Sequence, residues 1–234
     1  MTAGTLYLIP TFLSDDNFLV LPDSVVQTVH TLVDFVVEEE KSARRFLKRI
    51  KSPIAQSEFT FQLLNEHSNK EELSFILNKL KAGTNIGMLS EAGCPAVADP
   101  GSELVKLAHE NNIRIVPMVG PSSILLSLMG SGFNGQSFCF HGYLPREAKQ
   151  RQQKIKELER LAIKSGQTQI FIETPYRNTQ LIDDLLQTMN EESKLCIACE
   201  LTGQNENIRT KLIKQWKKNT PSFHKKPCIF LIGA

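Results

Sequence analysis

A segment at residues 90–101, SEAGCPAVADPG, combines residues that bend a backbone with two carboxylates. It follows the strand-like apolar run NIGMLS and precedes a stretch with helical spacing. Glycine gives a loop backbone freedom that other residues lack, and proline stiffens its path. Asp99 and Pro100 also resemble the start of a helix, but a helix cap leaves the preceding residues unexplained. The segment therefore predicts a ligand-binding loop in which Glu91 and Asp99 are the charged groups.

Two further segments place polar and turn residues where strands are expected to end. VGPSS, residues 119–123, puts a Gly-Pro turn and two hydroxyls at a helix start, where exposed N–H groups can bind an anion such as a carboxylate. IETPYRN, residues 172–178, ends a strand with a carboxylate, a proline, an aromatic residue and an arginine. An ordinary serine cap and an ordinary turn explain these two segments equally well.

Motifs of several common reaction types are absent from the sequence. It has no GxGxxG after its first strand, no GxxxxGK[ST], no HxH or HExxH pair and no GxSxG. These absences argue against a dinucleotide-binding Rossmann domain, a P-loop nucleotide hydrolase, a zinc enzyme and an α/β-hydrolase. The expected chemistry therefore uses neither a metal nor a protein nucleophile.

Five cysteines, an odd number, do not form the pattern of a disulfide framework. Cys196 and Cys199 make a lone CxxC in a segment expected to be a strand. Residues three apart on a strand point to opposite faces, so the pair suits neither a metal nor a redox couple. The sequence predicts that both thiols are buried and structural.

Strand-like and helix-like segments alternate along the chain, which favours crossover units and a largely parallel sheet. Ser68 and Glu71 form a capping-box pattern before a helix that ends at Gly83. In the first half, strands are expected at 5–10, 34–39, 57–67, 85–90 and 113–118, and helices at 23–32, 41–50, 70–83 and 102–112. In the second half, strands are expected at 137–144, 168–174, 194–201 and 226–234, and helices at 122–132, 146–166 and 178–189.

This pattern restarts near residue 118, which predicts two α/β domains with mainly parallel sheets, at residues 1–118 and 119–234. Ligands of parallel α/β sheets bind beyond the carboxyl ends of the strands, where the turn-rich segments fall. No apolar run approaches the ~18–20 residues of a membrane span. The N-terminal residues lack the basic flank and cleavage site of a signal peptide, so a cytoplasmic protein is expected.

Charge is divided unevenly along the chain, whose net charge is +2. Residues 1–117 hold 11 basic and 15 acidic residues, whereas residues 118–234 hold 16 basic and 10 acidic ones. The basic second half fits a polyanionic partner, although many such surfaces are only solvated faces. Residues 41–50, KSARRFLKRI, also have helical spacing with a basic face.

Five motifs follow one another along the chain: GTLYLIPT, LSEAGCPAVADPG, IRIVPMVGPSS, FHGYLPREAKQR and IFIETPYR. In order and spacing they resemble those of the tetrapyrrole methylase superfamily, and most of all its bacterial branch that methylates a cytidine 2′-hydroxyl of small-subunit ribosomal RNA. The resemblance runs from Gly4 to about Leu201. It implies two α/β domains, S-adenosylmethionine as cofactor in a cleft between them, and a homodimer. The activated methyl group is already electrophilic, so catalysis is largely alignment and needs no protein nucleophile.

The resemblance also implies the residues that contact the cofactor. They are Pro10, Ser90, Glu91, Gly93, Val97, Ala98, Asp99, Ser122, Ser123, Tyr143, Leu144, Glu173, Glu200 and Leu201. Transfer to a ribose hydroxyl requires a proton acceptor, for which Glu91 and Glu173 are the candidates. Basic residues after the motif GYLP are candidates to contact RNA phosphates. These are Arg146, Lys149, Arg151, Lys154 and Lys156.

Some segments depart from the pattern of the ribosomal RNA branch. TPIGNL becomes TFLSDD at residues 11–16, EDTR becomes EEEK at residues 38–41, and SDAGTP becomes SEAGCP. The loops that bind the cofactor match better than those expected to meet the acceptor. Ribosomal RNA is therefore the first acceptor considered, a tetrapyrrole or another small molecule the second, and a cofactor-binding relative without turnover the third possibility.

Overall fold

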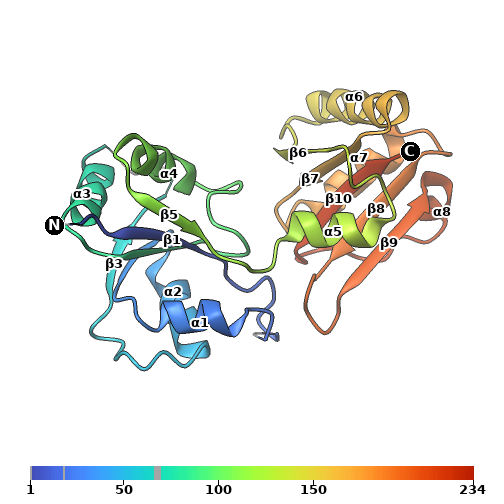
Figure 1. Ribbon diagram of the computed structural model, residues 1–234. Coiled ribbons are helices and arrows are strands. Elements are labelled where there is room, and N and C mark those ends of the chain that lie inside the picture. The colour runs from blue at the N-terminus through green and yellow to red at the C-terminus, as the bar shows by residue number, and fades with distance from the viewer. Residues whose placement is uncertain (1, 18, 66–69) are drawn as a thin grey trace. The chain divides into compact units, whose positions relative to one another are not determined.

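The computed structural model describes residues 2–17, 19–65 and 70–234, and it divides the chain into two α/β units, Met1–Ser122 and Ser123–Ala234 (Figure 1). The predicted α/β class is confirmed, while the domain boundary after residue 118 stays a prediction. Within the described ranges, no helix combines the length and the apolar character that crossing a membrane requires.

The first unit is built on a five-stranded sheet in which every pair of neighbouring strands is parallel, in the order β3-β2-β4-β1-β5. Each strand is followed by a connection that returns to the same end of the sheet, as the alternating pattern predicts. The elements are β1 (Thr5–Ile9), α1 (Asp23–Val29), β2 (Asp34–Val37), α2 (Glu40–Arg49), β3 (Thr60–Leu63), α3 (Lys70–Lys81), β4 (Ile86–Leu89), α4 (Gly101–Glu110) and β5 (Arg114–Pro117).

Helices cover both faces of this sheet. Helices α1 and α2 pack on one face, in a core that contains Phe35 and Val37 of β2. Helices α3 and α4 pack on the other face, in a core that contains Val36. Successive strand residues point to opposite faces, so an apolar run such as DFVV supplies both cores at once.

The second unit contains a mixed sheet in the order β6-β7-β10-β8-β9. Helices α6, α7 and α8 share one core with the sheet, and α5 packs against β8, β9 and β10. The elements are α5 (Ser123–Ser131), β6 (Phe138–Tyr143), α6 (Ala148–Ser165), β7 (Thr168–Ile172), α7 (Asn178–Thr188), β8 (Lys194–Cys199), β9 (Asn207–Leu212), α8 (Ile213–Lys218) and β10 (Cys228–Gly233).

Strand direction in the second sheet differs from the mainly parallel arrangement that the sequence predicts. Only β6 and β7 pair in parallel, while β10 is antiparallel to both β7 and β8, and β8 is antiparallel to β9. Strands β8 and β9 are joined by residues 200–206 without a crossover helix, and such a short connection requires an antiparallel pair. The parallel prediction is therefore correct for the first sheet and wrong for most of the second.

Two elements of the second unit, β9 and α8, have no counterpart among the predicted elements. Strand β9 carries exposed Arg209 and Thr210 in its middle, so its alternation is weak, and α8 has only six residues. Trp216 nevertheless anchors α8, because its indole N–H donates to the carbonyl of Leu195 at 2.9 Å. The predicted capping box of Ser68 lies outside the described residues.

Candidate functional site

The carboxyl ends of three neighbouring strands in the first unit, β4, β1 and β5, lead into the segments that the sequence singles out (Figure 1). Strand β1 leads into Pro10, β4 leads into Ser90, and β5 leads to residues 118–122. Parallel strands bring their carboxyl ends to the same edge of a sheet, so the three segments lie together there.

Hydrogen bonds join the first two of these segments. The Thr11 N–H donates to the Gly93 carbonyl at 2.9 Å, and the Thr11 hydroxyl donates to the Ser90 carbonyl at 3.0 Å. The Ser90 hydroxyl donates to the Gly93 carbonyl at 2.8 Å, and Ser90 is buried. The predicted cofactor residue Ser90 therefore shapes the loop with its hydroxyl group.

The bend at residues 119–122 lies against the other two segments. A Cβ placed on Gly120 would come within 2.4 Å of the Pro10 Cβ, so only glycine allows this approach. The Cys94 thiol donates to the Pro121 carbonyl at 3.6 Å, and it also contacts the Ser122 side chain. The bends around Gly93 and Gly120, predicted separately from the sequence, are neighbours in the first unit.

The end of the loop is held by Asp99. Its Oδ1 accepts hydrogen bonds from the N–H groups of Ala96 at 2.7 Å and Gly101 at 2.8 Å. Ala96 and Ala98 have φ angles of 63° and 60°, a left-handed conformation that costs free energy for a residue with a Cβ. Between them, Val97 leaves 49% of its surface exposed. The loop thus presents an apolar side chain and strained peptide groups to a ligand.

Three carboxylates gather where β2 and β4 end. The Glu91 N–H donates to Glu38 Oε1 at 3.4 Å, and the Ser42 hydroxyl donates to Glu91 Oε1 at 2.5 Å. Partial burial, followed by the nearby charges of Asp99 and Glu91, raises the pKa of Glu38. Partial burial also raises the pKa of Asp99, against the effect of its two backbone hydrogen bonds. Glu38 and Ser42 were not predicted as site residues. Glu38 lies in the altered segment EEEK, and Ser42 directly follows that segment.

A pocket opens beside this cluster in the first unit. Its empty volume, with the part open to solvent included, is about 430 Å³. Thr11 and Phe12 line it after β1, Ser90 and Glu91 line it after β4, and one side of α2 completes the wall. The pocket therefore shares its lining with the predicted cofactor loop.

In the second unit, Tyr143 and Leu144 follow β6 with opposite exposures. Tyr143 is 59% exposed, whereas Leu144 is 3% exposed and belongs to the core with α6 and α7. Any contact of Leu144 with a ligand must therefore use its backbone. Ser123 is the first residue of α5.

Glu173 follows β7 and has both carboxylate oxygens occupied. Oε1 accepts from the Thr174 N–H and Oε2 from Arg177, each at 2.7 Å, and the residue is 6% exposed. Both carboxylate oxygens of Glu173 are thus already engaged as hydrogen-bond acceptors within the second unit. The geometry therefore disfavours Glu173 as a catalytic base.

Glu200 and Leu201 follow β8 in a tight bend. Glu200 has a φ angle of 51°, and its carboxylate pairs with the Lys226 ammonium at 2.7 Å. Leu201 is 6% exposed. The bend thus holds the Glu200 carboxylate in an ion pair, while Leu201 is buried beside it.

Among the five predicted phosphate contacts, Arg151 is contradicted by the structure. It is 1% exposed, forms an ion pair with Asp184, and donates to the carbonyls of Pro145 at 3.3 Å and Arg146 at 2.7 Å. Its helical position faces the core of the second unit, so it is a structural residue. Arg146, Lys149 and Lys156 are exposed, and half-buried Lys154 pairs with Glu157 at 2.9 Å.

The predicted burial of Cys196 and Cys199 is confirmed. Both lie on β8, and only Cys199 belongs to the core under α6 and α7, so the two thiols point to opposite faces. Burial raises the pKa of Cys196 to about 11, which keeps its thiol protonated at neutral pH. All five cysteines of the chain carry free thiols.

The groups around Ser90–Gly101 fit S-adenosylmethionine. The exposed Val97 side chain suits the flat apolar face of adenine, strained peptide groups suit its polar edge, and the carboxylate of Glu91 suits a hydroxyl or an ammonium group. Within the described residues, no group of three or more His, Cys, Asp or Glu side chains is arranged to bind a metal ion.

Comparisons with known proteins show the family and the fold of the chain. The sequence profile of the family described as Tetrapyrrole (Corrin/Porphyrin) Methylases matches residues 26–216. Ribosomal RNA small subunit methyltransferase I from Buchnera aphidicola subsp. Schizaphis graminum is 32% identical over 237 residues, covering 98% of this chain and 78% of that protein. The protein of the same name from Synechocystis sp. is 31% identical over 235 residues, covering 99% of this chain and 80% of that protein.

A solved structure shows the same fold. Uroporphyrin-III C-methyl transferase from Thermus thermophilus, complexed with S-adenyl homocysteine, aligns with a TM-score of 0.60 at 13% sequence identity and covers 98% of this chain and 97% of that one. The chain is thus an S-adenosylmethionine-dependent methyltransferase. It belongs to the tetrapyrrole (corrin/porphyrin) methylase family, as its five motifs predicted.

Proposed function

We propose that this enzyme methylates a ribose 2′-hydroxyl of small-subunit ribosomal RNA. The observation that carries the proposal is the similarity over 98% of the chain to a relative named ribosomal RNA small subunit methyltransferase I. The solved tetrapyrrole methylase shares the fold at only 13% identity, which gives no support for a tetrapyrrole acceptor.

In the first unit, the proposed cofactor site is formed by the segments after β1, β4 and β5. The cofactor residues predicted for the second unit follow β6, β7 and β8. S-adenosylmethionine supplies a methyl group that is electrophilic because it is bonded to a positively charged sulfur. Asp99 and Ser90 shape the loop that binds it, and the peptide groups near Ala96 and Ala98 provide polar contacts.

The protein must orient the ribose oxygen and accept its proton. We assign the proton acceptor to Glu91, since its carboxylate lies at an exposed position beside the pocket, whereas Glu173 is buried in an ion pair. The hydrogen bond from the Ser42 hydroxyl fixes the orientation of the Glu91 carboxylate. Glu173 then positions Arg177 and the bend that follows β7.

The test is methyl transfer from labelled S-adenosylmethionine to small ribosomal subunits from a bacterial strain that lacks its ribosomal RNA small subunit methyltransferase I. We expect label in the RNA and, after nuclease digestion, a 2′-O-methylated nucleoside identified by mass spectrometry. Subunits from the parent strain should take up little label. Transfer to uroporphyrinogen without transfer to subunits would replace the proposal with a small-molecule acceptor, and cofactor binding without any transfer would replace it with a non-catalytic role.

We also propose that the enzyme is a cytoplasmic homodimer. The family resemblance implies the dimer, and α5 offers exposed apolar side chains to a second copy, with Leu125 at 52% and Met129 at 79% exposure. A ribosomal RNA substrate supports a cytoplasmic location. Light scattering on the purified chain should give twice the 26.3 kDa mass of one chain, and a monomeric mass would contradict the dimer.

A further inference from the structure

The outer face of α2 is the most basic surface segment of the first unit. Six of the 11 basic residues in 1–117 lie between Lys41 and Lys51, although this half of the chain is acidic in total. Ala43, Phe46 and Leu47 pack toward the sheet. Helical spacing then places the basic side chains together on the opposite side.

Most of this charge is not used within the protein. Arg44 is occupied, since it pairs with Glu40, donates to the Gln56 carbonyl and lies 4.7 Å from the centre of the Phe61 ring. Lys41, Arg45 and Lys48 are exposed, and no hydrogen bond or ion pair joins their side chains to another residue in the described part of the chain. These three we call the basic face of α2.

One edge of α2 also borders the pocket. Arg45 and Arg49 line it on the same side as Ser42, whose hydroxyl donates to Glu91 at 2.5 Å. The Phe46 ring, with its centroid 5.2 Å from that of Phe12, holds α2 against the segment after β1. The basic face therefore continues into the lining that contains the proposed proton acceptor.

Building on the proposed function, we propose that the basic face of α2, with Arg49, binds the phosphodiester backbone of the RNA strand that carries the methylated ribose. An arginine fork matches two phosphate oxygens, and lysines add charge along a strand. The carboxylates of Glu39 and Glu91 in the pocket would repel a phosphate but can accept hydrogen bonds from ribose hydroxyls. Phosphates therefore belong at the rim formed by Arg45 and Arg49, with the ribose toward the carboxylates.

Arg49 carries a competitor for the phosphate. Its guanidinium lies 2.7 Å from the Asp15 carboxylate, and the Asp15 side chain is 69% exposed. An exposed ion pair of this kind contributes little stability, so an RNA phosphate can replace the Asp15 carboxylate as the partner of Arg49. Removing the Asp15 charge should therefore strengthen RNA binding, which is the opposite of the effect of removing basic charge.

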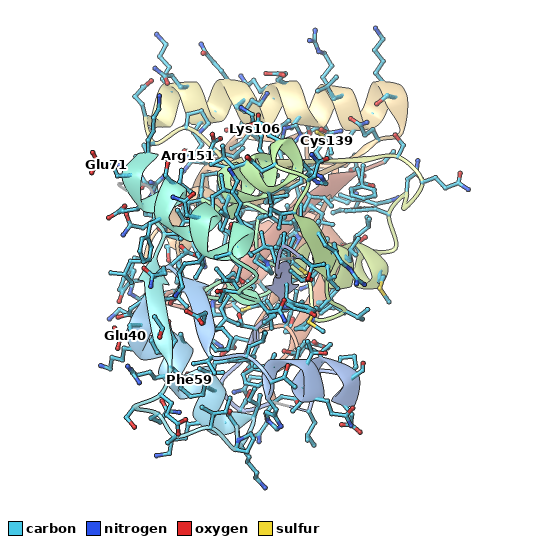
Figure 2. All side chains as sticks on the ribbon, turned by 60° about the vertical axis from the view of Figure 1, so that its left-hand side comes forward. Glu40, Phe59, Glu71, Lys106, Cys139 and Arg151 are labelled. Carbon is cyan, nitrogen blue, oxygen red and sulfur yellow. The ribbon has the colours of Figure 1, made fainter. Side chains whose placement is uncertain are left out.

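The experiment compares two double variants of the full chain that each lose two positive charges. Arg45→Gln with Lys48→Gln removes charge from the basic face. Lys106→Gln with Arg114→Gln removes it from α4, which covers the other face of the sheet, and from the amino end of β5, away from the pocket at the carboxyl ends of the strands. Figure 2 labels Lys106 on α4 and Glu40 at the start of α2, and these helices cover opposite faces of the sheet. Binding of a labelled single-stranded RNA and of small ribosomal subunits is measured without cofactor over a range of salt concentrations.

We expect the α2 variant to bind RNA about tenfold more weakly and with a smaller salt dependence, since the slope of log K against log[salt] falls by about 0.7 for each phosphate that the protein no longer neutralises. The Lys106 and Arg114 control should bind as the wild type does, and Asp15→Asn should bind more tightly. Equal weakening in both double variants would reduce the effect to net charge and overturn the inference, as would an α2 variant with unchanged affinity. Circular dichroism and melting temperature verify that each variant is folded.

Methyl transfer separates this inference from the proposed function. If the wild type binds RNA through α2 but transfers no methyl group to small subunits, the proposed function fails and α2 remains an RNA-binding helix. If the wild type methylates subunits and the α2 variant does so with unchanged affinity and rate, the inference about α2 fails and the proposed function stands.

Discussion

The ionised carboxylate of Glu38 destabilises the folded chain. Its pKa is raised mainly by partial burial and next by the nearby carboxylates of Asp99 and Glu91. A raised pKa means that the folded chain binds this proton more tightly than the unfolded chain does. Below the ordinary pKa of 4.5, Glu38 therefore does not lower the free energy of unfolding. The destabilisation grows as pH rises through the raised pKa that Glu38 has in the folded chain.

The variant Glu38→Gln should remove this cost, because an amide is uncharged at every pH and keeps an oxygen for the Glu91 N–H. We expect it to be more stable than the wild type at pH 7.5, with the advantage disappearing toward pH 4. Urea unfolding at a series of pH values measures the difference. Glu58→Gln, at an exposed position in the same unit, should show no comparable trend. An advantage that is independent of pH would contradict the electrostatic explanation.

Two substitutions of Asp99 test separately its role in the shape of the loop and the effect of its charge. Asp99→Ala leaves the N–H groups of Ala96 and Gly101 without their acceptor, so we expect a decrease of about 1–2 kcal/mol in the free energy of unfolding. Asp99→Asn keeps Oδ1 as the acceptor and removes a partly buried charge, so its stability should equal or exceed that of the wild type.

The affinity of these two variants for S-adenosylmethionine, measured by calorimetry, should follow the shape of the loop. We expect about tenfold weaker binding by the alanine variant, since it no longer holds Ala96 and Ala98 in their strained conformation. The asparagine variant should bind nearly as the wild type does. Equal weakening in both would show that the carboxylate itself contacts the cofactor.

Sequence could identify Asp99 and Glu91 because turn residues surround them in a single contiguous segment. It could not identify Glu38 and Ser42, which belong to the site only because β2 and β4 are adjacent in the sheet. It also could not tell that Glu173 is paired with Arg177 in a buried position, since burial depends on the whole second unit. The sequence of one segment shows which residue types it contains, whereas the contacts between residues of distant segments depend on the fold.

At the scale of elements, α6 shows how a charged helix divides between solvent and core. The predicted range of 146–166 agrees closely with the observed helix, Ala148–Ser165. Arg151 lies on the buried side with Ile155 and Leu158, where Asp184 of α7 neutralises it. The sequence of α6 shows positive charge at many positions, but α7 determines which of them remains available.

The variant Arg151→Met tests this structural role. Removing one partner leaves the Asp184 carboxylate buried without its cation, which should cost about 3–5 kcal/mol of unfolding free energy. Adding Asp184→Leu should recover part of that stability. The fraction of Arg151→Met that remains folded should bind RNA as the wild type does. In contrast, Lys149→Gln should weaken RNA binding without a change in stability. A stable Arg151→Met protein with weakened RNA binding would restore Arg151 as a phosphate contact.

Elements connected by crossovers were predicted more reliably than those in the last part of the chain. All five strands of the first sheet have predicted counterparts, because each is a short apolar run between turn residues and helices. Strand β9 was not predicted, since it alternates weakly, and α8 is too short for a periodic signal. Strand β9 and helix α8 lie between β8 and β10 in the chain, so the strand directions in the second sheet could not be predicted without these two elements.

At the scale of the whole chain, each unit has its own hydrophobic core. Binding of the cofactor to the folded chain should raise the free energy of unfolding. A ligand that binds only the folded state stabilises it by about 2.7 kcal/mol when present at 100 times its dissociation constant. For a chain of this size, each kcal/mol raises the melting temperature by roughly 2–4 °C.

S-adenosylmethionine at that concentration should therefore raise the melting temperature by roughly 5–10 °C in differential scanning calorimetry. S-adenosylhomocysteine, which keeps the adenosine and the amino-acid head, should act similarly, while ATP should have little effect because it lacks that head. Asp99→Ala, measured at the same cofactor concentration, should show a smaller ligand-induced shift than Asp99→Asn, because its affinity for the cofactor is lower. If all three ligands raised the melting temperature equally, the stabilisation would come from adenine alone, and the loop at Ser90–Gly101 would lose its proposed selectivity for the amino-acid head.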